Sequence, residues 1–159
     1  MALVNSPYAD LPKRAFWRTG VTERLSLDPG DLYRAKFPIA RGMRIMTAGS
    51  CFAQHVGRAL RRADFNVLDT EPLPAILAEG QEEYGYNLYS ARYGNIYTAR
   101  QLLQLLKEMR GDVEPADPVW EKDGRFYDAQ RPGVEPKGLD SADLVLTHRR
   151  AHLAAVREA

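Results

Sequence analysis

The chain has 159 residues, 45% of them hydrophobic and 27% charged, a balance typical of a folded soluble domain rather than of a disordered segment. Its 22 basic and 21 acidic residues leave a formal charge of +1, which gives no reason to expect a nucleic acid or a membrane surface as a partner. The single cysteine excludes an internal disulfide and fits a reducing compartment, so a cytoplasmic protein is expected.

Residues 1–43 show no regular hydrophobic period. Prolines and aromatic side chains alternate there, and so many aromatic residues are unusual in a disordered leader. The first residues lack the basic region and apolar core of a signal peptide, and no apolar run approaches the ~18 residues of a membrane span. We therefore expect residues 1–43 to form an arm that wraps a core made by residues 44–159, the two together being a single domain.

Residues 44–63 read as a short buried strand, a tight turn and a helix. Ile45 to Ala48 is the apolar run, Gly49 and Ser50 break it, and apolar residues then recur at helical spacing. Residues 65–68 predict a second buried strand, so that strand, helix and strand form a compact parallel unit. Ser50 and Cys51 stand at the carboxyl end of the first strand and at the start of the helix, where open α/β sheets present side chains to ligands.

The remaining elements follow from period and turn chemistry. Residues 69–97, rich in tyrosine and interrupted by proline and glycine, predict a structured loop. Thr98 with Gln101 forms a capping-box pattern for a helix that Gly111 ends. Residues 119–127 predict a hairpin that turns on Asp123-Gly124. Residues 140–159 predict a last helix with His152 on its inner face. Two parallel strands are few for an α/β sheet, and the helical pattern continues to the last residue, so we expect the amino-terminal part of a longer domain.

Cys51 and Ser50 are two competing candidates for a nucleophile. A thiol in the first turn of a helix feels the positive end of the helix dipole, which favours thiolate, and His55 lies one turn further on as a possible auxiliary group. Cys51 is alternatively a small packing residue, and Ser50 a helix cap. His148 and His152 share the spacing of a zinc-binding helix, but Arg149 replaces the glutamate that such a site needs. No metal or other cofactor is expected.

Several blocks of the sequence resemble bacterial members of the GSCFA family in order along the whole chain. The motif that names the family is present letter for letter, and the other blocks flank it; they are Phe37-Pro-Ile, Thr47-Ala-Gly-Ser-Cys-Phe-Ala-Gln-His55, Tyr93-Gly-Asn-Ile-Tyr-Thr-Ala-Arg-Gln-Leu-Leu-Gln-Leu105, Arg131-Pro and His152-Leu-Ala-Ala-Val156.

This family resembles the SGNH (GDSL-type) hydrolases, so the resemblance implies a flavodoxin-like three-layer α/β/α fold that is incomplete in this chain. In those enzymes the nucleophile follows the first strand in a Gly-Asp-Ser motif. Placing Gly49 on that glycine puts Cys51 at the nucleophilic serine and Ser50 at the aspartate, which is a departure in both residues. The hydrolases also supply Asp-x-x-His near the carboxyl end, and no such pattern follows residue 100. The general base is therefore expected beyond residue 159.

The resemblance also suggests oxyanion ligands. SGNH-type enzymes use a loop glycine N–H and an asparagine amide, and Gly94 and Asn95 fit by position, together with Gly49 and the N–H groups that follow it. Turn chemistry is the alternative explanation of Gly94 and Asn95. The chain is thus expected to belong to a hydrolase or acyltransferase that acts on an ester, such as an O-acylated carbohydrate. The alternatives are a non-catalytic module that binds a carbohydrate or an anion, and an inactive fragment. The oligomeric state is left open.

Overall fold

The computed structural model describes residues 6–24, 30, 32–76 and 83–159, and the chain divides into two compact units, Met1–Ile39 and Ala40–Ala159. The first unit contains two short helical turns, η1 (Lys13–Ala15) and η2 (Arg18–Thr22), which pack against each other. Gly20 of η2 contributes to this packing, because its N–H donates to the carbonyl of Phe16, the residue that follows η1, at 2.7 Å. The wrapping of residues 1–43 around the core remains a prediction.

The predicted strand–turn–helix unit is present in the second unit, but its strands are shorter than expected. Ile45 and Val67 form a single parallel bridge, and the Ile45 N–H donates to the Asn66 carbonyl at 2.9 Å. Two residues later, the Thr47 N–H bonds the Ser90 hydroxyl oxygen at 2.8 Å. A side chain thus takes the place of a neighbouring strand, and for this reason the ladder does not extend along residues 45–48. The order of the segments and their parallel direction are as predicted.

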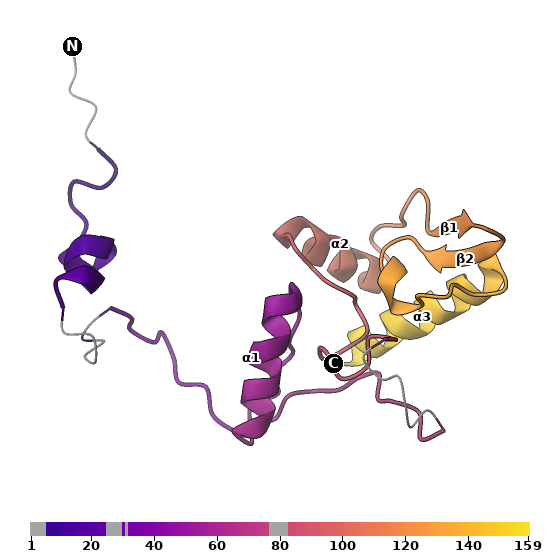
Figure 1. Cartoon of the computed structure of the whole chain (residues 1–159), viewed down its shortest axis with the longest axis horizontal. Helices are drawn as coiled ribbons and strands as arrows, with labels where there is room; N and C mark the ends of the chain where they lie inside the picture. Colours follow the sequence, from indigo (N-terminus) through magenta and orange to yellow (C-terminus); the bar gives the residue numbers. More distant parts are fainter. Residues whose placement is uncertain (1–5, 25–29, 31, 77–82) are drawn as a thin grey trace, which may run out of the picture. The chain divides into compact units, whose positions relative to one another are not determined.

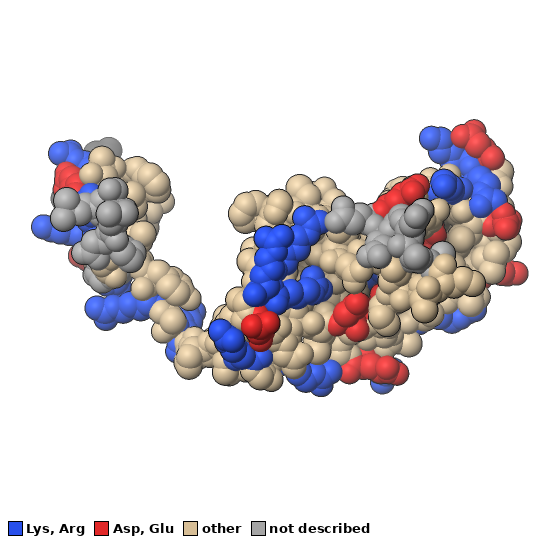
Figure 2. All heavy atoms as spheres, turned by 60° about the horizontal axis from the view of Figure 1, so that its bottom comes forward, with Lys and Arg blue, Asp and Glu red and all other residues tan. Residues whose placement is uncertain are grey.

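Helix α1 (Cys51–Arg62) begins directly after this turn (Figure 1). Its apolar stripe is strong, but Phe52 and Val56 are exposed. Its other side is basic: Figure 2 shows Lys and Arg side chains gathered over the part of the surface where α1 lies, and the helix carries Arg58, Arg61 and Arg62. Arg61 connects the helix to the tyrosine-rich loop, since its guanidinium donates to the Tyr89 carbonyl at 3.4 Å.

Helix α2 (Ala99–Arg110) has both of its predicted ends. The Thr98 hydroxyl accepts from the Gln101 N–H at 3.1 Å, and the Gln101 side chain accepts from the Thr98 N–H at 3.0 Å, so the capping box is closed. Gly111 ends the helix with φ 78°, a left-handed conformation that glycine adopts at little cost.

Strands β1 (Val119–Lys122) and β2 (Arg125–Asp128) form the predicted antiparallel hairpin on Asp123 and Gly124. A short turn of helix, η3 (Pro132–Val134), follows, and then helix α3 (Ala142–Glu158), which Ser141 caps through the Leu144 N–H. In Figure 1, α3 lies along the hairpin and packs against α2. Within the described residues, the second unit combines three α-helices with one two-stranded sheet, an arrangement compatible with the α/β class.

The core of this unit is supplied largely by the predicted structured loop. Tyr89, Ala91 and Tyr93 are buried together with Val156 of α3. Ser90 and Arg92, which lie between them, are buried as well, so the whole run of residues 89–93 is enclosed although the described part of residues 69–97 contains no helix or named strand. Residues 77–82 of that loop lie outside the described residues. Among the described residues, no helix combines the length and the apolar character that crossing a membrane requires.

Candidate functional site

The turn at Gly49, Ser50 and Cys51 joins the parallel bridge to α1 and carries both candidate nucleophiles. Ser50 occupies the N-cap position, but its hydroxyl makes no capping hydrogen bond. Cys51 is the first residue of the helix, and it is exposed with a free thiol. The packing explanation of Cys51 is therefore wrong, and so is the capping explanation of the Ser50 side chain. Both side chains are left available for chemistry at the helix N-terminus.

Gly49 holds a conformation that no other residue would take easily. Its φ is +154°, and a Cβ placed on it would lie 2.7 Å from the Cβ of Ala53. Contacts this short are essentially absent from folded proteins, and the neighbouring atom belongs to a helix that cannot withdraw. The glycine thus allows the first turn of α1 to fold back closely over the end of the strand.

We expect Gly49→Ala to destabilise the second unit by about 1–3 kcal/mol, because the added methyl overpacks this turn. Urea unfolding followed by circular dichroism measures the change. Gly124→Ala is the matched control: its φ is also positive, at 72°, but an added Cβ would meet no atom within 4 Å. An equal loss in both variants would show that conformation alone, and not the contact with Ala53, makes Gly49 necessary.

The structure brings Gly94 and Asn95 to the same turn. The Ile96 N–H donates to the Gly49 carbonyl at 2.8 Å, which holds residues 94–96 beside the end of the strand. Gly94 has φ 70°, so the turn chemistry weighed above is also real. A role in the turn and a role as an oxyanion ligand are compatible, since the turn at Gly94 and Asn95 holds backbone and amide groups beside the turn that carries Ser50 and Cys51.

Asn95 is oriented by a relay of side chains from α1. The Gln54 amide donates to the Tyr89 hydroxyl at 3.3 Å, and that hydroxyl donates to the Asn95 Oδ1 at 2.6 Å. Because the amide oxygen of Asn95 is the acceptor, its NH₂ group points away from Tyr89 and can donate to a ligand. Burial raises the pKa of Tyr89, and Cys51 raises it further, so the thiol lies within electrostatic reach of this hydroxyl.

Among the contacts described, the His55 side chain makes none with Ser50 or Cys51. His55 is exposed and makes an edge contact with Phe52, with ring centroids 6.1 Å apart.

A cleft of about 430 Å³ lies beside Asn95, and its size is within the range of small-molecule sites. Gln54, Tyr89, Gly94 and Asn95 line it, whereas Ser50 and Cys51 are not among its lining residues. Tyr97 and Trp120 add aromatic surface.

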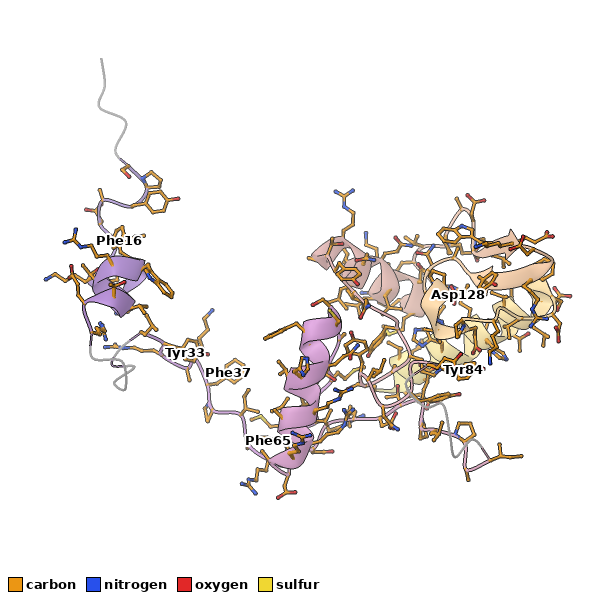
Figure 3. The ribbon with its side chains drawn as sticks, in the orientation of Figure 1. Phe16, Tyr33, Phe37, Phe65, Tyr84 and Asp128 are labelled. Atoms are coloured by element: carbon orange, nitrogen blue, oxygen red, sulfur yellow. The ribbon has the colours of Figure 1, made fainter. Side chains whose placement is uncertain are left out.

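A second cluster, buried and charged, lies against the same loop. Glu71 accepts from His152 Nδ1 at 2.6 Å and from the Arg92 N–H at 2.7 Å. Arg131 approaches Glu71 at 3.7 Å and donates to Asp128 at 2.8 Å. Figure 3 shows Asp128 at the end of β2, on the side of the hairpin that α3 covers.

Arg149 of α3 completes this cluster. It donates to Asp128 at 2.9 Å and bonds Glu108 of α2. The buried residues Val145, Arg149, His152 and Val156 recur along α3 at four, three and four residues. An arginine and a histidine on the same stripe as two valines are the sequence signal that would have pointed to buried ion pairs. Glu71 carries no comparable signal, because it lies in an irregular loop 81 residues from its partner His152.

A comparison with protein families finds a match that includes the sequence blocks from Thr47 to Val156, whereas the block Phe37-Pro-Ile lies before it. The model of the GSCFA family matches residues 44–159. The chain belongs to the GSCFA family. No curated protein and no solved structure matches the chain. In this GSCFA protein the matched range begins at the strand that precedes the Gly49–Cys51 turn and includes the loop and the buried cluster described above.

Protonation of His152 should make the stability of the protein depend on pH. Burial lowers the pKa of His152 below its ordinary value of 6.5, although the hydrogen bond that His152 donates to Glu71 acts in the opposite direction. The unfolded chain then binds more protons than the native one below pH 6.5. We expect the contribution of His152 to the free energy of unfolding to be constant above pH 6.5 and to fall as the pH drops below 6.5.

Urea unfolding between pH 5 and 8 tests this expectation. His152→Phe should remove this part of the pH dependence, whereas His148→Phe should keep it, because His148 is exposed. Glu71 adds a second loss of stability at lower pH, because its pKa in the folded protein lies below 4.5. Burial by itself raises this pKa, but the hydrogen bonds from His152 and Arg92 and the charge of Arg131 outweigh burial. A stability that rises as the pH falls from 7 to 5.5 would contradict the expectation for His152.

Proposed function

We propose that this GSCFA protein is part of an acyl-transfer enzyme. The enzyme would be a hydrolase or acyltransferase of the SGNH type that acts on an ester, with O-acylated carbohydrates as the substrate class. The hydrogen bond from the Ile96 N–H to the Gly49 carbonyl supports this proposal most directly. This bond supports the proposal because it holds residues 94–96, with the Asn95 amide, beside the turn that carries the exposed Cys51 thiol, and acyl transfer needs a nucleophile and hydrogen-bond donors together.

Cys51 is the proposed nucleophile. Its thiolate attacks the acyl carbon, and the negative charge that develops on the carbonyl oxygen is held by N–H groups of the 49–51 turn, by the Gly94 N–H and by the Asn95 amide. The carbon–oxygen bond of the ester then breaks, and the alcohol leaves with a proton from the general acid. Water or an acceptor alcohol attacks the thioester and restores the thiol. Ser50 is the rival nucleophile, with the same attack through its hydroxyl.

The general base is proposed to come from an Asp-x-x-His segment outside residues 1–159, completing a flavodoxin-like sheet to which the Ile45–Val67 bridge belongs. The buried His152 has no described contact with residues 49–51, so it is not proposed as the base for Cys51. Deprotonation of the nucleophile is thus separate from the Glu71–His152 pair.

Hydrolysis of p-nitrophenyl acetate by the full gene product tests the nucleophile. We expect Cys51→Ala to lower kcat/KM by at least about 10³-fold, since removing a nucleophile leaves only binding and oxyanion contributions. Ser50→Ala should change kcat/KM by less than about 10-fold, because its hydroxyl is expected only to position the substrate. His55→Gln is the control on the same helix and should be silent. Unchanged turnover in Cys51→Ala together with loss in Ser50→Ala would reassign the nucleophile to Ser50.

The aromatic cleft favours a second candidate, a module that binds carbohydrate without turnover. Tyr89, Tyr97 and Trp120 line it beside the amides of Gln54 and Asn95, and sugars bind to such combinations of ring faces and hydrogen-bonding groups. A wild-type protein that binds a methyl glycoside but hydrolyses no ester would favour this candidate. In that case Cys51→Ala would leave the dissociation constant unchanged, while Trp120→Ala would raise it.

A further inference from the structure

His152 carries a buried polar atom that no protein group in the described part of the chain satisfies. The residue is 1% exposed, and its Nδ1 is bonded to Glu71, but its Nε2 has no hydrogen-bond partner. Leaving a buried polar atom unsatisfied is unfavourable, so native proteins usually provide a water or a ligand for it. The other edge of this ring is therefore the place to look for a bound group.

The partner on Nδ1 decides what Nε2 can do. A carboxylate only accepts hydrogen bonds, so the contact of 2.6 Å between Glu71 Oε2 and His152 Nδ1 requires the proton on Nδ1. In the neutral ring Nε2 then carries a lone pair and acts as an acceptor. Burial lowers the pKa of His152, which keeps the ring neutral at pH 7. Whatever occupies this position must donate a hydrogen bond.

A cavity of about 50 Å³ is lined by His152, and Glu71 is not among its lining residues. This volume exceeds what one water needs and suits a small organic group. Tyr93, Ile96 and Leu105 form apolar wall. The remaining lining residues are polar and include four with side-chain amides: Asn95, Gln101, Gln104 and Gln130.

The charges around this cavity select the ligand. Glu108 lines it together with Arg131 and Arg149, and because Glu108 is bonded to Arg149 it leaves no uncompensated negative charge for a cation. Both guanidiniums are already bonded to carboxylates, at Asp128 and, for Arg149, also at Glu108, so they leave no uncompensated positive charge for an anion. The lone pair on Nε2 also repels an anion. A neutral hydrogen-bond donor remains, and the four side-chain amides, which both donate and accept, match hydroxyl groups that do the same.

We propose that this cavity binds a neutral hydroxyl-bearing ligand of the polyol or carbohydrate class, with one O–H donating to His152 Nε2. The site is additional to the acyl-transfer site and does not depend on Cys51, although Asn95 lines both the cavity and the larger cleft. A sugar in the cleft can therefore extend one hydroxyl or hydroxymethyl group past Asn95 to His152. Glu71 acts as the positioning residue, since it sets the tautomer that makes Nε2 an acceptor.

Nitrogen NMR of the imidazole rings tests the proposal on the wild-type chain. Protein labelled with ¹⁵N at histidine is titrated at pH 7 with ethylene glycol and, separately, with acetonitrile, which has a similar size but no O–H group. We expect glycol to move the Nε2 resonance of His152 upfield in a saturable way, as hydrogen bonding to an unprotonated nitrogen does. Acetonitrile should leave that resonance in place.

Variants on α3 supply the assignment and the control. His152→Phe should remove the responding signal, and His148→Phe should leave it unchanged, because His148 is exposed one turn earlier on the same helix. The comparison of the two probes needs no variant, so it holds even if His152→Phe fails to fold. No response to glycol, an equal response to acetonitrile, or a proton on Nε2 would overturn the proposal. Because no turnover is measured, this result stands apart from that of the Cys51→Ala assay.

Discussion

Arg149→Leu is expected to lower the free energy of unfolding by ~3–5 kcal/mol, because it leaves the buried carboxylate of Glu108 without its cation and that of Asp128 with Arg131 alone. Arg149, Glu108 and Asp128 are only 5%, 6% and 8% exposed, so water cannot replace the lost guanidinium. The three residues come from α3, α2 and the end of β2, and the loss therefore loosens all three elements at once. Urea unfolding followed by circular dichroism measures the effect.

Arg150→Leu is the matched control for this variant. Arg150 is the next residue on α3, is exposed, and bonds only Thr147 on its own helix at 3.0 Å among the contacts described. A surface arginine of this kind contributes at most ~1 kcal/mol. Adding Glu108→Gln to Arg149→Leu should recover part of the loss, since the uncompensated charge of Glu108 is then gone. Equal losses for Arg149→Leu and Arg150→Leu would contradict the assigned role of the buried pair.

Tyr93→Ala is expected to cost ~3–5 kcal/mol, the range for truncating a large buried aromatic side chain. Tyr93 belongs to the core cluster and packs edge-on against His152, with ring centroids 5.7 Å apart. The cavity left behind would open directly on the Glu71–His152 pair. We expect this variant to lose both stability and the glycol response of His152, because Tyr93 forms one wall of the proposed site.

Tyr93→Phe separates packing from the hydroxyl group. It keeps the ring, so the stability loss should stay near ~1 kcal/mol, the net contribution of one hydrogen-bonding group. Burial and the nearby charge of Glu71 raise the pKa of Tyr93 to about 12. Ultraviolet titration of the native protein should accordingly show at least one tyrosine fewer ionising near pH 10 than the unfolded chain shows. A Tyr93→Phe variant as unstable as Tyr93→Ala would mean that the hydroxyl, and not the ring, carries the stabilisation.

Local pattern was sufficient for the helices and the hairpin. Thr98 with Gln101, Gly111 and Asp123-Gly124 are signals whose physical cause lies within a few residues, and the structure has each of them. The same local pattern overstated the two parallel segments. Strand length depends on what pairs with the strand, and the partner at Thr47 is the side chain of Ser90, 43 residues away.

The candidate nucleophiles were found by position, but their surroundings were not. Gly49, Ser50 and Cys51 stand in one motif, so strand–turn–helix geometry alone brings them together. The relay through Gln54 and Tyr89 that orients Asn95 joins residues 35 and 6 positions apart, and nothing in their spacing predicts it. For His55, helical spacing alone predicts a position one turn from Cys51, but spacing does not tell whether its side chain contacts Cys51. In the structure the His55 side chain is exposed to solvent.

The sequence by itself determined the elements, the family blocks and the turn at Gly49, because capping, glycine conformation and hydrophobic period act over a few residues. Only the tertiary structure decided which groups meet: that Ile96 bonds the Gly49 carbonyl, that Glu71 reaches His152, and that Arg149 joins α2 to β2. Buried ion pairs and buried hydrogen-bond acceptors without a partner depend on contacts between distant segments. Such contacts stabilise the protein only after folding has brought those segments together and removed them from water.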